Sequence, residues 1–231
     1  MTIGLFISAI IAPALLWLLY FRYQDRFRPE PFRILGLTYL LGILAGLLCA
    51  RFYLLLPYMG LPWDPAAVTS EFGPACFFQN VLVVGPVEEV FKFLPFLFVI
   101  YHFRHFDEEI DGIIYASVIA LGFASYENLH YLPYMGSLEL VGRAVASPLT
   151  HTIFSSIWGY MVGRARHAGR SIIVPSIVGL LTASLLHGIF NVCTVTPLVR
   201  ILSSVIILLV WIWRIRTMER LGRGERIDLT R

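Results

Sequence analysis

Residues 34–56 read ILGLTYLLGILAGLLCARFYLLL, an apolar run long enough to cross a bilayer as one helix. A hydrocarbon core of about 30 Å requires about 20 residues of helix. Segments rich in proline, glycine and charge separate this run from others of its kind, as expected of loops. Seven stretches meet the requirement: Ile3–Phe21, Ile34–Leu56, Pro74–Tyr101, Gly112–Leu132, Val141–Val162, Ile172–Thr194 and Leu198–Trp213. The sequence therefore predicts an all-α, polytopic transmembrane helix bundle of about seven spans.

The amino-acid composition excludes an ordinary soluble domain. Of the 231 residues, 58% are hydrophobic and only 14% are charged, whereas a soluble domain carries about a quarter charged residues. The net charge of +3 is small, and the basic residues form no cluster of the kind that binds nucleic acid. We therefore expect the lipid bilayer to surround the protein, and we expect no nucleic-acid partner.

Arginines alternate between the predicted connections. The first, third and fifth connections and the C-terminal tail contain arginine, whereas the second, fourth and sixth contain no basic residue. Because lysine and arginine accumulate in cytoplasmic loops, this pattern predicts that the N-terminus lies outside and the C-terminus in the cytoplasm. The N-terminal run has no preceding basic segment and is too long for a signal peptide, so we expect a retained first span.

The three cysteines lie in apolar segments and form no CxxC pair. We interpret Cys49, Cys76 and Cys193 as small buried hydrophobic residues. Cys76 and Cys193 both fall near the predicted outer face, and the sequence leaves open whether they form a disulfide.

Four predicted spans carry polar side chains that a lipid-facing helix tolerates poorly. An ionisable group at the bilayer centre costs about 2.5–3.5 kcal/mol on insertion scales, so these side chains must share partners or surround a water-filled cavity. They are Glu88, Glu89 and Lys92 in the third span, Glu127 and Asn128 in the fourth, His151 in the fifth, and His187 and Asn191 in the sixth.

The depths of these groups indicate one shared site. At 1.5 Å of rise per residue, Glu88 lies about 20 Å from the start of its span and His151 about 15 Å from the outer end of its own. Glu127 and His187 each lie about 22 Å from the cytoplasmic ends of theirs. All four therefore fall between the midplane and the outer third of the bilayer, and we expect a cluster reached from the outer half.

Residue spacing adds local expectations. Glu88 and Lys92 are four residues apart and can pair on one helix face. His187 and Asn191 are also four apart, so Asn191 can orient the imidazole or donate to an oxyanion. Each pair alone also fits a structural role, such as an ion pair or a polar contact between helices. The conjunction of such groups on four spans at one depth favours a functional site.

The residue types suit the hydrolysis of a peptide bond. A carboxylate with a raised pKa can take a proton from water and pass it to the leaving amine, while imidazole and amide groups stabilise the oxyanion. Metal-assisted hydrolysis is the alternative, because two histidines and one or two glutamates suit a catalytic zinc. Its candidate ligands are Glu88, Glu127, His151 and His187, and the residues alone do not separate the two mechanisms.

The region from Gly85 to Asn191 resembles the PrsW family of bacterial intramembrane proteases, which is related to the CAAX prenyl endopeptidases and the Abi proteins. The resemblance lies in EEVFK at residues 88–92, DGIIYA at 111–116, LGFA at 121–124, the pair Glu127-Asn128, His151, and HGIFN at 187–191. Compared with the CAAX enzymes, Lys92 replaces an arginine that stands one residue later, and Glu127 occupies the place of a histidine.

This resemblance implies a multi-pass protease of the bacterial cell membrane. It implies that Glu88 activates water, that Glu89 is its partner, and that Asn191 lies on the oxyanion side. The substrate would be a single-span membrane protein, such as an anti-sigma factor cut on its extracytoplasmic side. We accordingly expect one transmembrane domain over residues 1–231, with catalytic-core helices at 74–194 and a cytoplasmic basic tail at 214–231.

Two other functions compete with the protease. Buried glutamate, histidine and lysine also build proton relays, so the chain could be a proton- or ion-coupled transporter. The sequence shows no inverted repeat of spans, which argues against that function. A non-catalytic scaffold that binds membrane proteins is the third hypothesis, and the full set of candidate catalytic groups argues against it.

Overall fold

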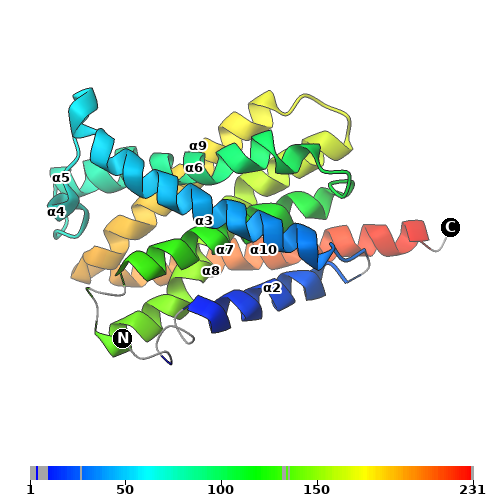
Figure 1. Cartoon of the computed structure of the whole chain (residues 1–231), viewed down its shortest axis with the longest axis horizontal. Coiled ribbons are helices and arrows are strands. Elements are labelled where there is room, and N and C mark those ends of the chain that lie inside the picture. The colour runs from blue at the N-terminus through cyan, green and yellow to red at the C-terminus, as the bar shows by residue number, and fades with distance from the viewer. Residues whose placement is uncertain (1–3, 5–9, 27, 132–133, 135, 230–231) are drawn as a thin grey trace.

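The computed structural model describes residues 4, 10–26, 28–131, 134 and 136–229, and all regular structure within these residues is helical. Figure 1 shows the long helices lying side by side as a bundle, with the C-terminal part of α10 extending past the others. The longer helices are α2 (Ala12–Gln24), α3 (Phe32–Leu55), α6 (Gly85–Phe98), α7 (Glu109–Tyr131), α8 (Ser137–His167), α9 (Ile173–Val195) and α10 (Arg200–Leu229). Two single-turn helices, α4 (Pro65–Val68) and α5 (Pro74–Phe77), lie in and after the loop that follows α3.

Four helical segments are long and apolar enough to cross a membrane. They are Phe32–Leu55, Glu109–Tyr131, Ile173–Val195 and Pro197–Gly222, and each coincides with a predicted span. The predicted fifth span lies within α8, and the start of the predicted first span lies outside the described residues. The all-helical membrane fold is therefore confirmed, whereas the count of seven spans and the orientation of the termini stay predictions.

The predicted third span is not one regular helix. Its first turn is α5, followed by the π-helical turn η3 (Phe78–Val84) and then by α6, which ends at Phe98. Pro86 stands in the first turn of α6, where the missing N–H of proline costs little. Because π turns are often found at functional sites, it is notable that η3 ends only four residues before Glu88.

Helix α7 forms the centre of the bundle. Every residue from Ile110 to Ser125 is buried, and the helix packs most extensively against α8 and α3. Gly112 of α7 faces Gly159 of α8 so closely that a Cβ atom on Gly112 would collide with the Gly159 carbonyl oxygen. Small residues let membrane helices approach in this way, and the α7–α8 contact fixes the positions of Glu127 and His151.

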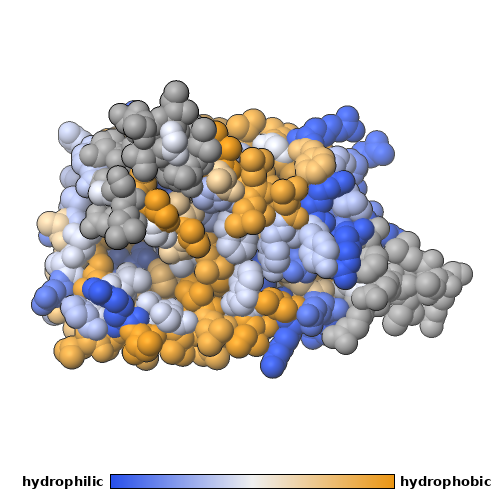
Figure 2. Space-filling model, turned by 90° about the horizontal axis from the view of Figure 1, so that it is seen from below, coloured by the Kyte–Doolittle hydropathy of each residue, from blue (hydrophilic) through white to orange (hydrophobic). Residues whose placement is uncertain are grey.

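The outer surface of the bundle is apolar across its middle. Large side chains that are exposed to the surroundings line α3, α9 and α10, including Leu40, Leu44, Leu181, Leu208 and Leu209. Figure 2 shows hydrophobic side chains across the middle of one face, with hydrophilic ones towards the two ends. An apolar surface of this extent needs lipid contact, so the structure supports a membrane-embedded protein.

Its three cysteines are all free and buried.

Candidate active site

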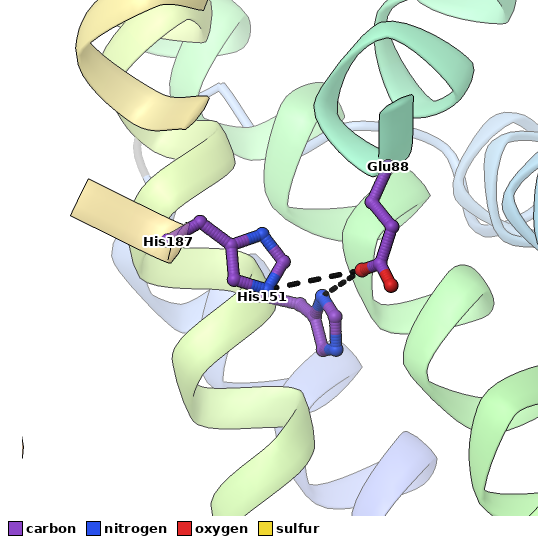
Figure 3. A group of neighbouring side chains, drawn as sticks. All are labelled: Glu88, His151 and His187. Carbon is purple, nitrogen blue, oxygen red and sulfur yellow. Dashed lines mark ion pairs between the residues drawn. The ribbon is translucent and has the colours of Figure 1, made fainter. Parts of the chain in front are cut away.

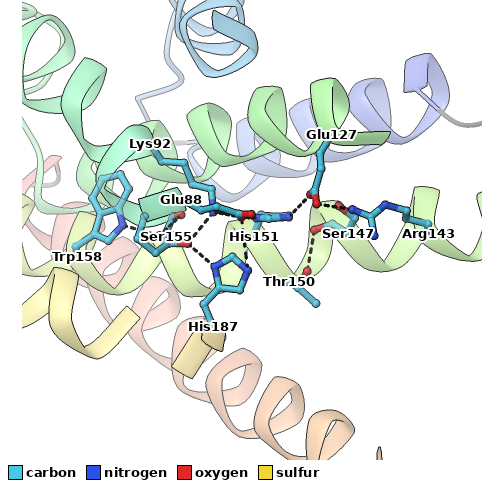
Figure 4. A network of polar contacts seen from close by, with 11 residues as sticks. Glu88, Lys92, Glu127, Arg143, Ser147, Thr150, His151, Ser155, Trp158 and His187 are labelled. Atoms are coloured by element: carbon cyan, nitrogen blue, oxygen red, sulfur yellow. Dashed lines mark hydrogen bonds and ion pairs between the residues drawn. The ribbon is translucent and has the colours of Figure 1, made fainter. Parts of the chain in front are cut away.

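Polar side chains from α6, α7, α8 and α9 meet inside the bundle (Figure 4). The structure brings together six of the eight residues predicted for the site, although their positions span a hundred residues of sequence. These six are Glu88, Glu89, Lys92, Glu127, His151 and His187. The prediction that four spans contribute to one cluster agrees with this arrangement.

Glu89 is the fully satisfied carboxylate of the cluster. Its Oε1 atom accepts from Lys92 Nζ at 2.7 Å and from His187 Nδ1 at 3.0 Å. Its Oε2 atom accepts from Ser155 Oγ at 2.8 Å and from Trp158 Nε1 at 3.0 Å. Four donors converge on a side chain that is 0% exposed, so the lone pairs of Glu89 are engaged and its role is to hold its neighbours in place.

The bond to Glu89 determines the tautomer of His187. Because Nδ1 donates to the Glu89 carboxylate, Nε2 carries the lone pair of the neutral ring. That Nε2 atom lies 3.8 Å from Oε2 of Glu88. Phe154 stacks on the imidazole with the ring centroids 5.5 Å apart, which further restricts the orientation of His187.

His151 is oriented in the same way by a different carboxylate. Its Nε2 atom donates to Glu127 Oε2 at 2.8 Å, so Nδ1 carries the lone pair and accepts from Lys92 Nζ at 2.8 Å. Arg143 fixes the other oxygen of Glu127, with Nη2 2.6 Å from Oε1. A chain of contacts therefore runs from Arg143 through Glu127 and His151 to Lys92.

Glu88 differs from the other members of the cluster in having a free acceptor. Its Oε2 atom is buried, yet no hydrogen bond from a described residue reaches it. It lies 3.8 Å from Lys92 Nζ and 3.9 Å from His151 Nδ1. The predicted pairing of Glu88 with Lys92 is thus confirmed as an ion pair, but Lys92 approaches Glu89 more closely.

The free acceptor of Glu88 and the lone-pair nitrogens of both histidines point to one place (Figure 3). These three atoms lie within 4.8 Å of one another, which is a spacing that one metal ion can bridge. Two imidazoles and a carboxylate form a donor set of the catalytic-zinc type, and each imidazole gives its remaining N–H to a carboxylate, as metal-binding histidines do. The residues therefore fit a metal ion. Glu127 lies on the far side of His151, outside this group.

Two glycines let α9 approach the start of α6 at the site. A Cβ atom on Gly85 would collide with the carbonyl oxygen of Ser184 in α9. One on Gly188 would lie 2.5 Å from the Asn80 carbonyl oxygen and 2.5 Å from Val81 Cα, both in the π turn. Gly188 thus lets the helix that carries His187 lie directly against the π turn.

The two predicted asparagines are not joined to the cluster. Asn128 is buried on α7, and its Oδ1 atom accepts no hydrogen bond within the described part of the chain. Asn191 follows His187 by one helical turn and is half-buried, and no described hydrogen bond connects its side chain to the cluster. Their roles in catalysis stay predictions.

Three side chains of the site were not predicted from the sequence: Arg143, Ser155 and Trp158. Arg143 is an arginine inside a predicted apolar span, which is itself a signal of a functional partner. Ser155 and Trp158 offer no such signal, because serine and tryptophan are ordinary residues in membrane helices. Their partner Glu89 lies 66 and 69 positions away in the chain.

Comparison with known proteins agrees with this geometry. Residues 30–214 match the family described as PrsW family intramembrane metalloprotease. Protease PrsW of Oceanobacillus iheyensis is 37% identical over 186 residues, and Protease PrsW of Bacillus subtilis is 31% identical over 186 residues, with 80% of each chain covered in both cases. Protease PrsW of Clostridioides difficile is 28% identical over 222 residues, which cover 93% of this chain and 89% of the relative.

No solved structure matches this chain. The family match nevertheless includes all four helices that carry the cluster, and the relatives come from bacteria. The prediction of a bacterial membrane protease from the run Glu88-Glu89-Val90-Phe91-Lys92 and its companion segments is therefore confirmed, and the chain belongs to the PrsW family of intramembrane metalloproteases.

Proposed function

We propose that the protein is an endopeptidase that hydrolyses a peptide bond in a single-span membrane protein such as an anti-sigma factor. The observation that supports this most directly is the buried Oε2 atom of Glu88, which accepts no hydrogen bond from the described residues and lies near two imidazoles. A carboxylate with an open lone pair inside a bilayer can accept a proton from water and deliver it to a leaving amine.

The two adjacent glutamates have different tasks in this mechanism. Glu88 acts on water, because its acceptor is open. Glu89 holds the side chains of Lys92 and His187 in position, because both donate hydrogen bonds to its carboxylate. Two carboxylates in different surroundings commonly divide acid–base chemistry from electrostatic support.

In a zinc-dependent form of the mechanism, the open acceptor of Glu88 would be a metal ligand instead of the base. Glu88, His151 and His187 would hold the zinc ion, and when bound it would lower the pKa of water and polarise the scissile carbonyl group. Glu127 and Glu89 would keep the two imidazoles in the tautomers that present a lone pair. Metal-free hydrolysis with Glu88 as the base is the alternative mechanism.

Asn191 and Lys92 are the candidates for stabilising the oxyanion. Asn191 lies one turn beyond His187 on α9, and its side chain is half-buried. Lys92 carries the positive charge nearest to Glu88 Oε2, at 3.8 Å. Asn128 supports the site from α7, beside Glu127.

The proposed topology has seven spans in the bacterial cytoplasmic membrane, with the N-terminus outside and the C-terminus in the cytoplasm. Residues 1–231 form one transmembrane domain, 74–194 form the catalytic core, and 214–231 form the basic tail. Alternating arginines support this orientation, and the apolar band of Figure 2 supports the embedding. The catalytic cluster then lies in the outer half of the membrane.

Purified protein in detergent, incubated with a panel of tagged single-span anti-sigma factors, tests the proposal. Wild-type protein should cleave at least one of them, and Glu88→Ala should not, while Glu71→Gln in an exposed loop serves as the matched control. Cleavage by Glu88→Ala at the wild-type rate would refute the assignment.

Metal content separates the two mechanisms. Under the zinc mechanism the purified protein retains about one equivalent of zinc, a chelator such as 1,10-phenanthroline abolishes cleavage, and added zinc restores it. Full activity in metal-free protein would instead support direct activation of water by Glu88.

A further inference from the structure

Four carboxylates gather at a second place, where the connection between α2 and α3 meets the start of α7. They are Asp25, Glu30, Glu108 and Asp111, and all four are at most 6% exposed. Asp111 precedes Glu127 by sixteen positions on α7, which corresponds to about 24 Å along the helix. This acidic cluster is therefore separate from the active site.

Three of these side chains already have the spacing of ligands around one ion. Asp25, Glu108 and Asp111 each place one carboxylate oxygen within 4.8 Å of the other two. Oxygen atoms that coordinate Ca²⁺ at about 2.4 Å lie no more than about 4.8 Å apart. The arrangement thus needs little change to bind a cation.

Backbone hydrogen bonds fix two of the three carboxylates. Asp25 Oδ2 accepts from the N–H of Glu30 at 2.9 Å. Asp111 Oδ2 accepts from the N–H groups of Asp107 and Glu108 at 2.9 and 2.7 Å. These bonds hold each acidic side chain against its own loop, so a cation between them would connect two loops that are distant in sequence.

Glu30 provides an independent indication of a missing ligand. Its Oε2 atom is buried, and no described residue donates a hydrogen bond to it. The Tyr115 side chain and the negative charges of Asp107 and Glu108 act on this carboxylate, so Glu30 lies beside the acidic cluster. The nearby Arg28 forms its ion pair with Glu108, at 2.9 Å. Oε2 of Glu30 is therefore a buried acceptor that still requires a partner.

A surface pocket borders the cluster at Glu108. The pocket has a volume of about 220 Å³ and is lined by Asp107, Glu108 and Arg166 among others. A metal site requires an entry path, and this pocket offers one as far as Glu108.

We propose that Asp25, Glu30, Glu108 and Asp111 bind a hard divalent cation such as Ca²⁺ or Mg²⁺. An all-oxygen set selects such ions, whereas the two imidazoles of the active site suit zinc. The bound cation connects the α2–α3 loop to the first turn of α7, and it thereby stabilises the central helix on which Glu127 stands. Its task is structural, and it takes no part in peptide-bond hydrolysis.

The test uses the chain of residues 1–231 with His151 and His187 replaced by alanine, so that the active-site ligands are removed. Titration with Mn²⁺, followed by electron paramagnetic resonance, should show one saturable site. Ca²⁺ should displace the Mn²⁺ and raise the melting temperature of the protein. Glu30→Gln should weaken Mn²⁺ binding at least tenfold, whereas the matched variant Glu109→Gln, at the first residue of α7, should leave it unchanged.

Two results would overturn the proposal. One is the absence of saturable Mn²⁺ or Ca²⁺ binding up to about 1 mM, the weak end of dedicated calcium sites. The other is saturable binding that Glu30→Gln and Asp25→Asn both leave unchanged, because the ion would then lie elsewhere. Glu30→Gln keeps the test valid even if Asp25→Asn fails to fold, since the Glu30 side chain holds no backbone group in place.

Discussion

The Nζ atom of Lys92 lies 2.8 Å from Nδ1 of His151, which is the ring nitrogen that faces Glu88. A metal ion held by Glu88, His151 and His187 would require the lone pair that Lys92 now occupies. The ammonium group and the metal therefore exclude each other at Nδ1. Lys92 can withdraw from His151 and remain bound to Glu89, which it contacts at 2.7 Å.

This competition predicts that Lys92→Met binds zinc more tightly than the wild type. A hydrogen bond from a charged donor contributes about 1.5 kcal/mol or more, so its loss should tighten binding about tenfold. Removing the positive charge beside Glu88 should also favour zinc binding, because the charge repels the metal ion. The zinc dissociation constant, measured in detergent by competition with a chelating dye, tests the prediction, and Lys92→Arg serves as the control that keeps the charge. Unchanged or weaker zinc binding in Lys92→Met would contradict it.

Replacing each of the two neighbouring glutamates by glutamine should affect different properties, cleavage for Glu88 and stability for Glu89. Glu88→Gln should abolish cleavage and leave thermal stability near the wild-type value, because Oε2 of Glu88 accepts no described hydrogen bond. Glu89→Gln should lower the free energy of unfolding by about 3–5 kcal/mol, since it removes the carboxylate that Lys92 contacts at 2.7 Å and leaves this buried ammonium with Glu88 alone, at 3.8 Å. Melting temperatures and cleavage rates of the two variants provide the comparison. Equal destabilisation by both substitutions would show that the carboxylates do not have separate tasks.

Glu127 should matter for zinc affinity although it lies outside the group of metal-binding atoms. Its Oε2 atom holds the Nε2 proton of His151, and Arg143 holds its other oxygen. Glu127→Gln removes the charge that keeps His151 in this tautomer, so zinc affinity should fall about 10- to 100-fold. Glu71→Gln is the exposed control. The prediction fails if Glu127→Gln binds zinc like the wild type and loses only activity, because Glu127 would then act on the substrate.

The bundle and most of the cluster could be predicted from the sequence because both depend on local information. Apolar length predicts the helices, and an ionisable residue such as Glu88 or His151 within an apolar run is rare enough to be noticed. The division of tasks between Glu88 and Glu89 could not be predicted. It depends on which donors reach each oxygen, and those donors stand on α8 and α9, far along the chain.

The π turn also could not be predicted, since the apolar residues of η3 fit an α-helix equally well. Arg143 was missed for a different reason. It stands two residues inside a predicted span, whereas the arginines used to predict the orientation were those of the connections between spans. Within a bilayer, such a residue needs a partner of opposite charge, and Glu127 on the preceding helix is that partner.

Close packing of Gly188 against the π turn should make this position sensitive to an added methyl group. Gly188→Ala places a methyl group 2.5 Å from the Asn80 carbonyl oxygen and from Val81 Cα, both of which are backbone atoms of η3. Helix α9 must then move away from η3, and His187, the residue before Gly188, moves with it. We expect a loss of about 1–3 kcal/mol in the free energy of unfolding, as for other overpacked interiors, together with a fall in zinc affinity. Gly36→Ala in α3, where no described atom outside the adjacent turns of the same helix lies within 4 Å of the added methyl group, should change neither quantity appreciably. Wild-type zinc affinity in Gly188→Ala would mean that the position of His187 does not depend on this contact.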